Sequence, residues 1–227
     1  MTNLALFDLD HTLIPIDSDH EWGRFMMKLG IVDSESFTRE NNLFFNAYKA
    51  GKLDIRAYLA SMLSPLAKYS RAQLSEWHAQ YMQEIIQPEI MPVALNLVRS
   101  HINNGDLCCV VTATNEFITR PIALAFGISA LIACEVETVD GHPDSLLTGR
   151  SIGVPSYREG KVKRTEAWLS TLGKRFDDFK HSYFYSDSHN DIPLLERVTD
   201  PVVTNSDDVL RAYAQKRGWK ILDLFKT

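Results

Sequence analysis

The chain has 227 residues, which is long enough for one domain of ordinary size plus an insertion, with a sizeable buried core. Its 45% hydrophobic and 23% charged residues are typical of a soluble globular protein and exclude a disordered chain. The formal net charge of -5, with no basic stripe, excludes a general nucleic-acid binder, whose affinity depends on neutralising phosphates.

The sequence shows no segment that would direct the chain to a membrane or out of the cell. No run of about 18 apolar residues could span a bilayer, and no charged, apolar and cleavable signal precedes Asp8. The three cysteines lack metal-site spacing and suit a reducing compartment. We therefore expect a cytoplasmic protein, monomeric or homodimeric, that binds neither nucleic acid nor membrane.

The first predicted element is a strand that ends at two carboxylates. In Leu4–Ile14, LALFDLDHTLI, apolar residues typical of a buried strand run directly into Asp8 and Asp10. Open α/β sheets bind ligands at this end of their strands, and the backbone can turn there so that both carboxylates face one phosphorus atom or metal ion. The alternative is a solvated strand end, because aspartate is common in turns and helix caps.

Residues 16–87 are predicted to form four helices with no strand between them. Ser18, Asp54 and Ser70 are suitable caps for three of these helices, and the other spans about Ser36 to Ala50. A helical block between the first strand and the rest of a sheet is best explained as a separate small bundle, a cap that lies over the strand ends as a lid.

From Pro88 onward, predicted strands and helices alternate. Strands are expected at 107–111, 131–139, 147–152, 182–185, 201–204 and 219–222, and helices at 92–102, 115–126, 165–172, 192–197 and 207–217. This alternation predicts an α/β fold with a doubly wound, mostly parallel sheet covered on both faces. Residues 1–15 and 88–227 would form this core.

Two polar features follow within the core. At 110–115, VVTATN, a strand ends in two threonines around Ala113. A hydroxyl such as that of Thr112 and free backbone N–H groups can bind phosphate there, although threonine also caps helices generally. Lys161 lies near the start of a predicted helix and is either a site residue or a solvated lysine. Neither feature is decisive alone.

A third strand ends in an acidic loop, where Asp187 and Asp191 are four residues apart and available to a hard cation. A parallel sheet brings the carboxyl ends of its strands together at one edge. Because Asp8, Thr112 and Asp187 follow three separate strands, we expect their side chains to form one site.

The ordered motifs are DxDxT, then a threonine at a strand end, then a lysine, then DSxxD. This set covers Asp8 to Asp191 and resembles the haloacid dehalogenase-like superfamily. The early helical insertion is similar to its subfamily IB, the branch of phosphoserine phosphatase-like and histidinol-phosphatase-like proteins. The resemblance implies a phosphatase in which Asp8 is the nucleophile that forms an aspartyl-phosphate. Asp10 would protonate the leaving group and then activate water.

The resemblance also implies a Mg²⁺ cofactor, held by Asp8, the backbone carbonyl of Asp10, and Asp187. Asp191 would orient the lysine or the metal waters. Ser186 stands where the family usually has glycine, and we expect this small residue to be tolerated. Four groups would bind the phosphoryl oxygens: Thr112, the amide of Ala113, Lys161 and Asn190.

The predicted cap should determine the substrate. In phosphoserine phosphatases an acidic residue seven positions after the second motif aspartate binds the substrate ammonium, and that position is Asp17. Their lid arginine, which binds the substrate carboxylate, aligns with Ala60 here. Arg56, one helical turn or about 6 Å earlier, is the candidate to replace it. This displacement disfavours phosphoserine. Asp19 and Trp22 form an acidic and aromatic entrance that suits a cation, or the acid simply complements the helix dipole.

The sequence therefore predicts a magnesium-dependent phosphomonoester hydrolase acting on a small, amine-bearing phosphate ester, with histidinol phosphate slightly favoured over phosphoserine. A receiver-like signalling module, phosphorylated at a strand-end aspartate, is an alternative that needs the same sheet, acidic site, threonine and lysine. The helical insertion and Asp10 disfavour this alternative, because a receiver needs neither a lid nor an acid for a leaving group.

Overall fold

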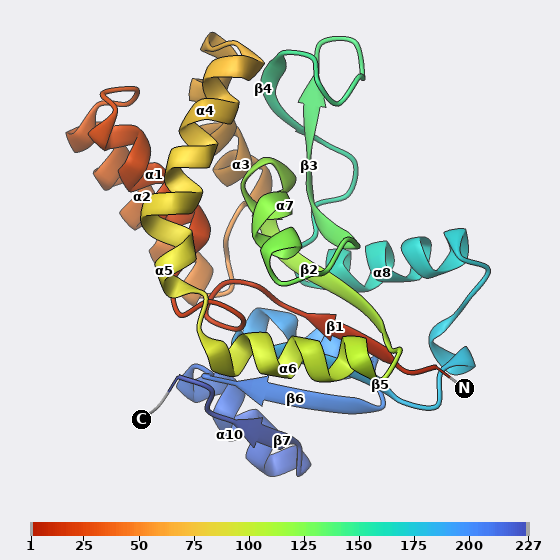
Figure 1. The fold of residues 1–227 in the computed structure, drawn as a ribbon. Helices are drawn as coiled ribbons and strands as arrows, with labels where there is room; N and C mark the ends of the chain where they lie inside the picture. The colour runs from red at the N-terminus through yellow and green to blue at the C-terminus, as the bar shows by residue number, and fades with distance from the viewer. Residues whose placement is uncertain (1, 226–227) are drawn as a thin grey trace.

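A computed structural model describes residues 2–225 of the chain. Its framework is a seven-stranded sheet in the order β4-β3-β2-β1-β5-β6-β7, with β1 (Leu4–Phe7) in the centre (Figure 1). The other strands are β2 (Leu107–Asn115), β3 (Leu131–Thr138), β4 (Leu147–Ile152), β5 (Ser182–Ser186), β6 (Asp200–Thr204) and β7 (Lys220–Leu222). Neighbouring strands of this sheet are parallel except β3 and β4, so the predicted doubly wound, mostly parallel sheet is confirmed.

The pairing register brings the carboxyl ends of the central strands level. Phe7 of β1 pairs with Val110 of β2 and with Tyr185 of β5. Asp8 therefore emerges beside the residues that follow these partners on both neighbouring strands. The strand β2 runs four residues past its predicted end, so Thr112 lies within the strand instead of after it.

Helices cover both faces of the sheet. One face carries α6 (Pro92–Asn103) and α7 (Glu116–Ala125), and the other carries α8 (Glu159–Thr171), α9 (Ile192–Leu195) and α10 (Asp208–Arg217). Side chains alternate along β1, so that Ala5 and Phe7 join the buried cluster on the first face while Leu4 and Leu6 join the cluster on the second. The helix α8 begins six residues before its predicted start, which places Lys161 in its first turn.

The helical stretch between β1 and α6 contains α1 (Ser18–Lys28), α2 (Ser34–Lys49), α3 (Ile55–Leu63), α4 (Arg71–Tyr81) and the short α5 (Gln87–Glu89). The four predicted helices correspond to α1–α4, and they gather beside the carboxyl end of β1 (Figure 1). The prediction that Ser18 caps the first helix is wrong, because Asp17 is the N-cap and accepts a hydrogen bond from His20 N–H. No helix within residues 2–225 is long and apolar enough to cross a membrane.

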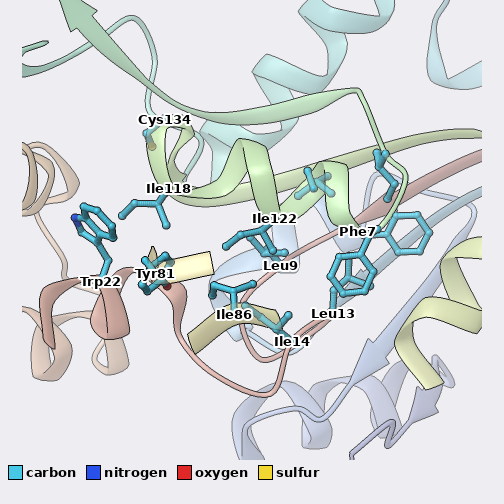
Figure 2. Close-up of a cluster of buried hydrophobic side chains, with 14 of the residues drawn as sticks. Phe7, Leu9, Leu13, Ile14, Trp22, Tyr81, Ile86, Ile118, Ile122 and Cys134 are labelled. Carbon is cyan, nitrogen blue, oxygen red and sulfur yellow. The ribbon is translucent and has the colours of Figure 1, made fainter. Parts of the chain in front are cut away.

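These N-terminal helices share a buried cluster with the sheet (Figure 2). Trp22 of α1 and Tyr81 of α4 lie in the same cluster as Phe7 of β1 and Ile118 of α7. The Trp22 and Tyr81 rings meet edge to face with centroids 5.1 Å apart. This packing fixes α1 against the end of the sheet, while the division of the chain into a core and a separate cap domain stays a prediction.

Candidate active site

Lys161 links carboxylates from two strand ends. Its Nζ donates to Asp8 Oδ1 at 3.0 Å and to Asp191 Oδ2 at 2.7 Å, and the residue is only 2% exposed. Burial alone would lower the pKa of Lys161, but the charges of Asp191 and Asp8 outweigh this effect and raise the pKa above its usual value. The predicted nucleophile therefore lies against a permanent buried cation.

Ser186, which occupies the position where the family usually has glycine, belongs to the same network. The residue is fully buried, and its Oγ donates to Asp191 Oδ2 at 2.7 Å. The same oxygen accepts a hydrogen bond from Ser188 N–H at 3.2 Å. The hydroxyl thus orients Asp191 and fixes the acidic loop that follows β5, so this departure from the family pattern adds contacts to the site.

Asp10 is oriented by two elements that are distant in sequence. Its Oδ1 accepts from the backbone N–H of Ser18 at the start of α1 at 2.7 Å, and its Oδ2 accepts from Thr114 Oγ1 at 2.9 Å. Burial, followed by the charge of Asp17, raises the pKa of Asp10 to about 6. We assigned no role to Thr114 from the sequence, although it is the second of the two threonines around Ala113.

The third strand end brings Asp187 to the same edge. Thr12 Oγ1 donates to Asp187 Oδ1 at 3.3 Å, which joins the threonine of the DxDxT motif to the DSxxD motif. Burial, with added repulsion from Asp8 and Asp191, raises the pKa of Asp187 well above its usual value. The pKa of Asp8 is raised to about 7, mainly by burial and against the opposing charge of Lys161. Two neighbouring acids are therefore difficult to ionise together without a further cation.

The acidic residues at this edge of the sheet are suitable ligands for the predicted magnesium ion. Within residues 2–225, no three side chains of His, Cys, Asp or Glu are grouped to hold one metal ion. The predicted set needs only two side chains, Asp8 and Asp187, together with the backbone carbonyl of Asp10. Magnesium usually binds one or two carboxylates and keeps several waters, so a set of this composition is sufficient for it.

The predicted phosphate-binding residues on β2 lie at this edge of the sheet. Thr112 is 1% exposed, and its hydroxyl accepts a hydrogen bond from Thr114 N–H at 3.1 Å. Ala113 is half-buried, and its carbonyl accepts from the Cys134 thiol at 3.1 Å. The Thr112 hydroxyl oxygen is therefore already oriented before a phosphate binds to it.

Asn190 lies where the acidic loop meets the N-terminal helices. Its Oδ1 accepts from Tyr157 OH at 3.1 Å, and its Nδ2 donates to the carbonyl of Tyr48 at 3.4 Å. The hydroxyl of Tyr48, near the end of α2, donates to Ser188 Oγ at 2.8 Å. The α2 helix is thereby joined to the loop of Asp187 and Asp191, a connection that no local sequence pattern indicates.

The structure separates the four predicted cap residues into two groups. Asp19 and Trp22 are each 1% exposed, and neither the carboxylate of Asp19 nor the Nε1 of Trp22 has a hydrogen-bond partner of good geometry among the described residues. Asp17 is half-buried and caps α1. Arg56 is exposed, and its guanidinium donates to the carbonyl of Gly153 at 2.9 Å, so the structure does not bring it into the network around Asp8.

Comparison with known proteins agrees with this geometry. A sequence model of the haloacid dehalogenase-like hydrolase family matches residues 5–196, and the chain therefore belongs to this family. The membership expected from the order of the motifs is confirmed, and the chain is an enzyme of a hydrolase family and not a receiver module.

Two relatives and one solved structure are similar over nearly the whole chain. The chain is 44% identical over 223 residues to the histidinol-phosphatase of Neisseria meningitidis serogroup C (strain 8013), covering 98% of this chain and 99% of the relative. It is 29% identical over 232 residues to a phosphoserine phosphatase of Mycobacterium tuberculosis (strain ATCC 25618 / H37Rv), covering 98% and 71%. The crystal structure of a protein of unknown function from Bordetella pertussis Tohama I is 46% identical, with a TM-score of 0.92 over 99% of this chain and 100% of that chain.

Proposed function

We propose that this hydrolase is a magnesium-dependent phosphomonoesterase that works through an aspartyl-phosphate on Asp8. The observation that carries the proposal is the buried contact between Lys161 and Asp8, at the same edge of the sheet as the half-buried Asp10 and Asp187. Hydrolysis of phosphate monoesters is among the slowest uncatalysed reactions, partly because an anionic nucleophile must approach an anionic phosphate. A buried lysine that neutralises the carboxylate and the incoming phosphoryl oxygens reduces this repulsion.

The reaction has two displacements at phosphorus. A carboxylate oxygen of Asp8 forms a bond to phosphorus while the bond to the ester oxygen breaks, and Asp10 gives its proton to that leaving oxygen. Asp10 then takes a proton from water, whose oxygen attacks phosphorus and releases Asp8. The pKa of Asp10, raised to about 6, supports this double role, because an acid–base group works best near the ambient pH.

Magnesium would be held by Asp8, Asp187 and the backbone carbonyl of Asp10. When bound, it supplies positive charge that neutralises the phosphoryl oxygens. The raised pKa values of Asp8 and Asp187 support the assignment, since these buried acids lack sufficient compensating charge in the protein itself. Thr112, the Ala113 amide, Lys161 and Asn190 would bind the remaining phosphoryl oxygens.

Histidinol phosphate is the substrate that we favour. The relative from Neisseria, 44% identical over nearly the whole chain, is named a histidinol-phosphatase, which supports this choice. Ala60 stands at the position of the family's carboxylate-binding arginine, and Arg56 is exposed and bonded to Gly153. Phosphoserine is the second candidate, because the relative from Mycobacterium is a phosphoserine phosphatase. The cytoplasmic location and the monomeric or homodimeric state stay predictions.

Phosphate release with Mg²⁺ from histidinol phosphate, phosphoserine, phosphoethanolamine and p-nitrophenyl phosphate tests the proposal. We expect the highest kcat/KM for histidinol phosphate, little change in Arg56→Ala, and no turnover by Asp8→Asn. A preference for phosphoserine that Arg56→Ala abolishes would show that Arg56 binds the substrate carboxylate. Failure to hydrolyse any of the four esters would contradict the proposed phosphomonoesterase activity.

A further inference from the structure

Asp19, in the first turn of α1, is a buried acid with no ion-pair partner among residues 2–225. It is 1% exposed, and neither carboxylate oxygen has a hydrogen-bond partner of good geometry among the described residues, although the Tyr58 hydroxyl is close enough to lower its pKa. The charges that act on it most strongly are those of Asp17 and Asp10, and both are negative. Buried carboxylates are normally paired or bonded to several donors, so this side chain lacks the partner that its burial requires.

Two neighbours of Asp19 on α1 are also buried without partners. The Ser18 Oγ and the Trp22 Nε1 have no hydrogen-bond partner of good geometry within residues 2–225, although the Ser18 hydroxyl is close enough to Asp10 to lower the pKa of that residue. The backbone N–H of the same Ser18 holds Asp10 at 2.7 Å, so these unpartnered groups begin directly beside the proposed acid–base residue. Unpartnered buried polar groups are rare in native proteins, and several on one helix turn next to a reaction centre indicate a place for a polar ligand.

The negative charge around Asp19 determines which kind of ligand can bind there. Burial, followed by the negative charge of Asp17, raises the pKa of Asp19 to about 8, which means that the surroundings do not stabilise the ionised form enough to offset its burial. A neutral or anionic ligand group would leave the carboxylate uncompensated. A cationic N–H group would pair with it and donate a hydrogen bond at the same time.

Asp17 is less suited to this role. One of its oxygens accepts the His20 N–H and so caps α1, and the residue is only half-buried. A half-exposed carboxylate binds a cation more weakly than a buried one, because water screens the charges. The family resemblance assigns the substrate ammonium to the position of Asp17, whereas burial and the lack of partners favour the residue two positions further on.

We propose that the Asp19 carboxylate, together with the Tyr58 hydroxyl, binds the cationic nitrogen group, an ammonium or an imidazolium, of the phosphate ester that this enzyme hydrolyses. The inference rests on the proposed function, and it names the residue that makes the site select a cationic substrate. The phosphoryl group would lie at Asp8 and the nitrogen at Asp19, and the charge of Asp10 acts on both of these carboxylates.

Asp19→Asn tests this inference, because the amide keeps the shape of the side chain and removes its charge. The measured quantity is the ratio of kcat/KM for histidinol phosphate to kcat/KM for p-nitrophenyl phosphate, which carries no cation. We expect this ratio to fall at least about 30-fold, mainly through a higher KM for histidinol phosphate, as for the loss of a buried charge pair. Phosphoethanolamine, whose only cation is an ammonium, separates that group from the imidazolium.

Glu35→Gln is the matched control, because Glu35 is the second residue of α2 as Asp19 is of α1, but it is exposed. The control should leave the ratio unchanged. Binding of histidinol, the dephosphorylated alcohol, measured by calorimetry gives a second readout that needs no catalysis, and Asp19→Asn should weaken it to a similar extent.

Two results would overturn the inference in distinguishable ways. If Asp19→Asn lowers kcat/KM for histidinol phosphate and p-nitrophenyl phosphate equally, Asp19 does not select a cation, while the phosphatase activity stands. If the wild-type enzyme hydrolyses neither ester, the proposed function fails and the inference fails with it.

Discussion

Thr114 Oγ1 donates a hydrogen bond of 2.9 Å to Asp10 Oδ2, although the two residues are 104 positions apart in the chain. The other oxygen of Asp10 accepts the backbone N–H of Ser18. The carboxylate is therefore held between the end of β2 and the start of α1. Because proton transfer depends on geometry before it depends on pKa, Thr114 acts as a positioning residue for the proposed acid.

Thr114→Val removes this hydrogen bond and keeps the shape of the side chain. We expect kcat/KM to fall about 10- to 100-fold for an alkyl phosphate, whose leaving oxygen needs a proton, and much less for p-nitrophenyl phosphate, whose leaving group does not. Thr114→Ser, which keeps the hydroxyl, should retain most of the activity. An equal loss on both esters would show that Thr114 supports the fold and not the proton transfer.

The pH dependence of stability should report on Asp19. Its pKa is raised to about 8 in the folded chain, against 3.8 ordinarily, first by burial and then by Asp17, with Tyr58 opposing. Between these values the folded state keeps a proton that the unfolded state has lost. The stabilisation is therefore fully present below about pH 4 and is lost as the pH rises through about 8.

Asp19→Asn lacks this titration and should unfold less readily than the wild type as the pH rises. We expect the difference in the free energy of unfolding between variant and wild type to grow by roughly 2 kcal/mol from pH 6 to pH 8, in favour of the variant. Urea unfolding at constant magnesium concentration measures it, with Glu35→Gln as the control. Parallel curves for Asp19→Asn and the wild type would mean that Asp19 is ionised with a partner throughout.

Much of this site was predictable because its residues follow strands. Asp8, Thr112 and Asp187 were expected together, since an apolar run before each indicated a buried strand and parallel strands end at one edge. Lys161 required the order of the motifs, because a lysine near the start of a helix is usually solvated. The sheet then buried it to 2% exposure between Asp8 and Asp191.

Other features depend on contacts that no local pattern indicates. The bond from Tyr48 to Ser188 joins residues 140 positions apart, and it exists because α2 packs against the loop after β5. The helical periodicity around Arg56 gave no means of knowing that its guanidinium would bond to Gly153. Ser18 and Asp17 are both good caps, and the choice between them was decided by Asp10, which binds the Ser18 N–H.

Magnesium binding should be detectable without catalysis. A ligand that binds only the folded state raises its stability, by about 2.7 kcal/mol at a hundred times Kd. We expect Mg²⁺ to raise the Tm of the wild type, and the shift to be largely lost in Asp187→Asn, which removes one of the two proposed carboxylate ligands. Asp177→Asn, in the short 3-10 helix before β5 and exposed, is the control and should keep the full shift. A full shift in Asp187→Asn would place the metal elsewhere.

The covalent intermediate on Asp8 is the central claim, and trapping it is the most direct test. The wild-type enzyme is mixed with histidinol phosphate and Mg²⁺ and quenched in acid within the first turnover. It is then digested, and the masses of its peptides are measured by mass spectrometry. The account predicts one phosphoryl group on the peptide that contains Asp8, and none after the same treatment of Asp8→Asn. Rapid release of phosphate with no phosphorylated peptide at any quench time, or a phosphoryl group on another residue, would contradict it.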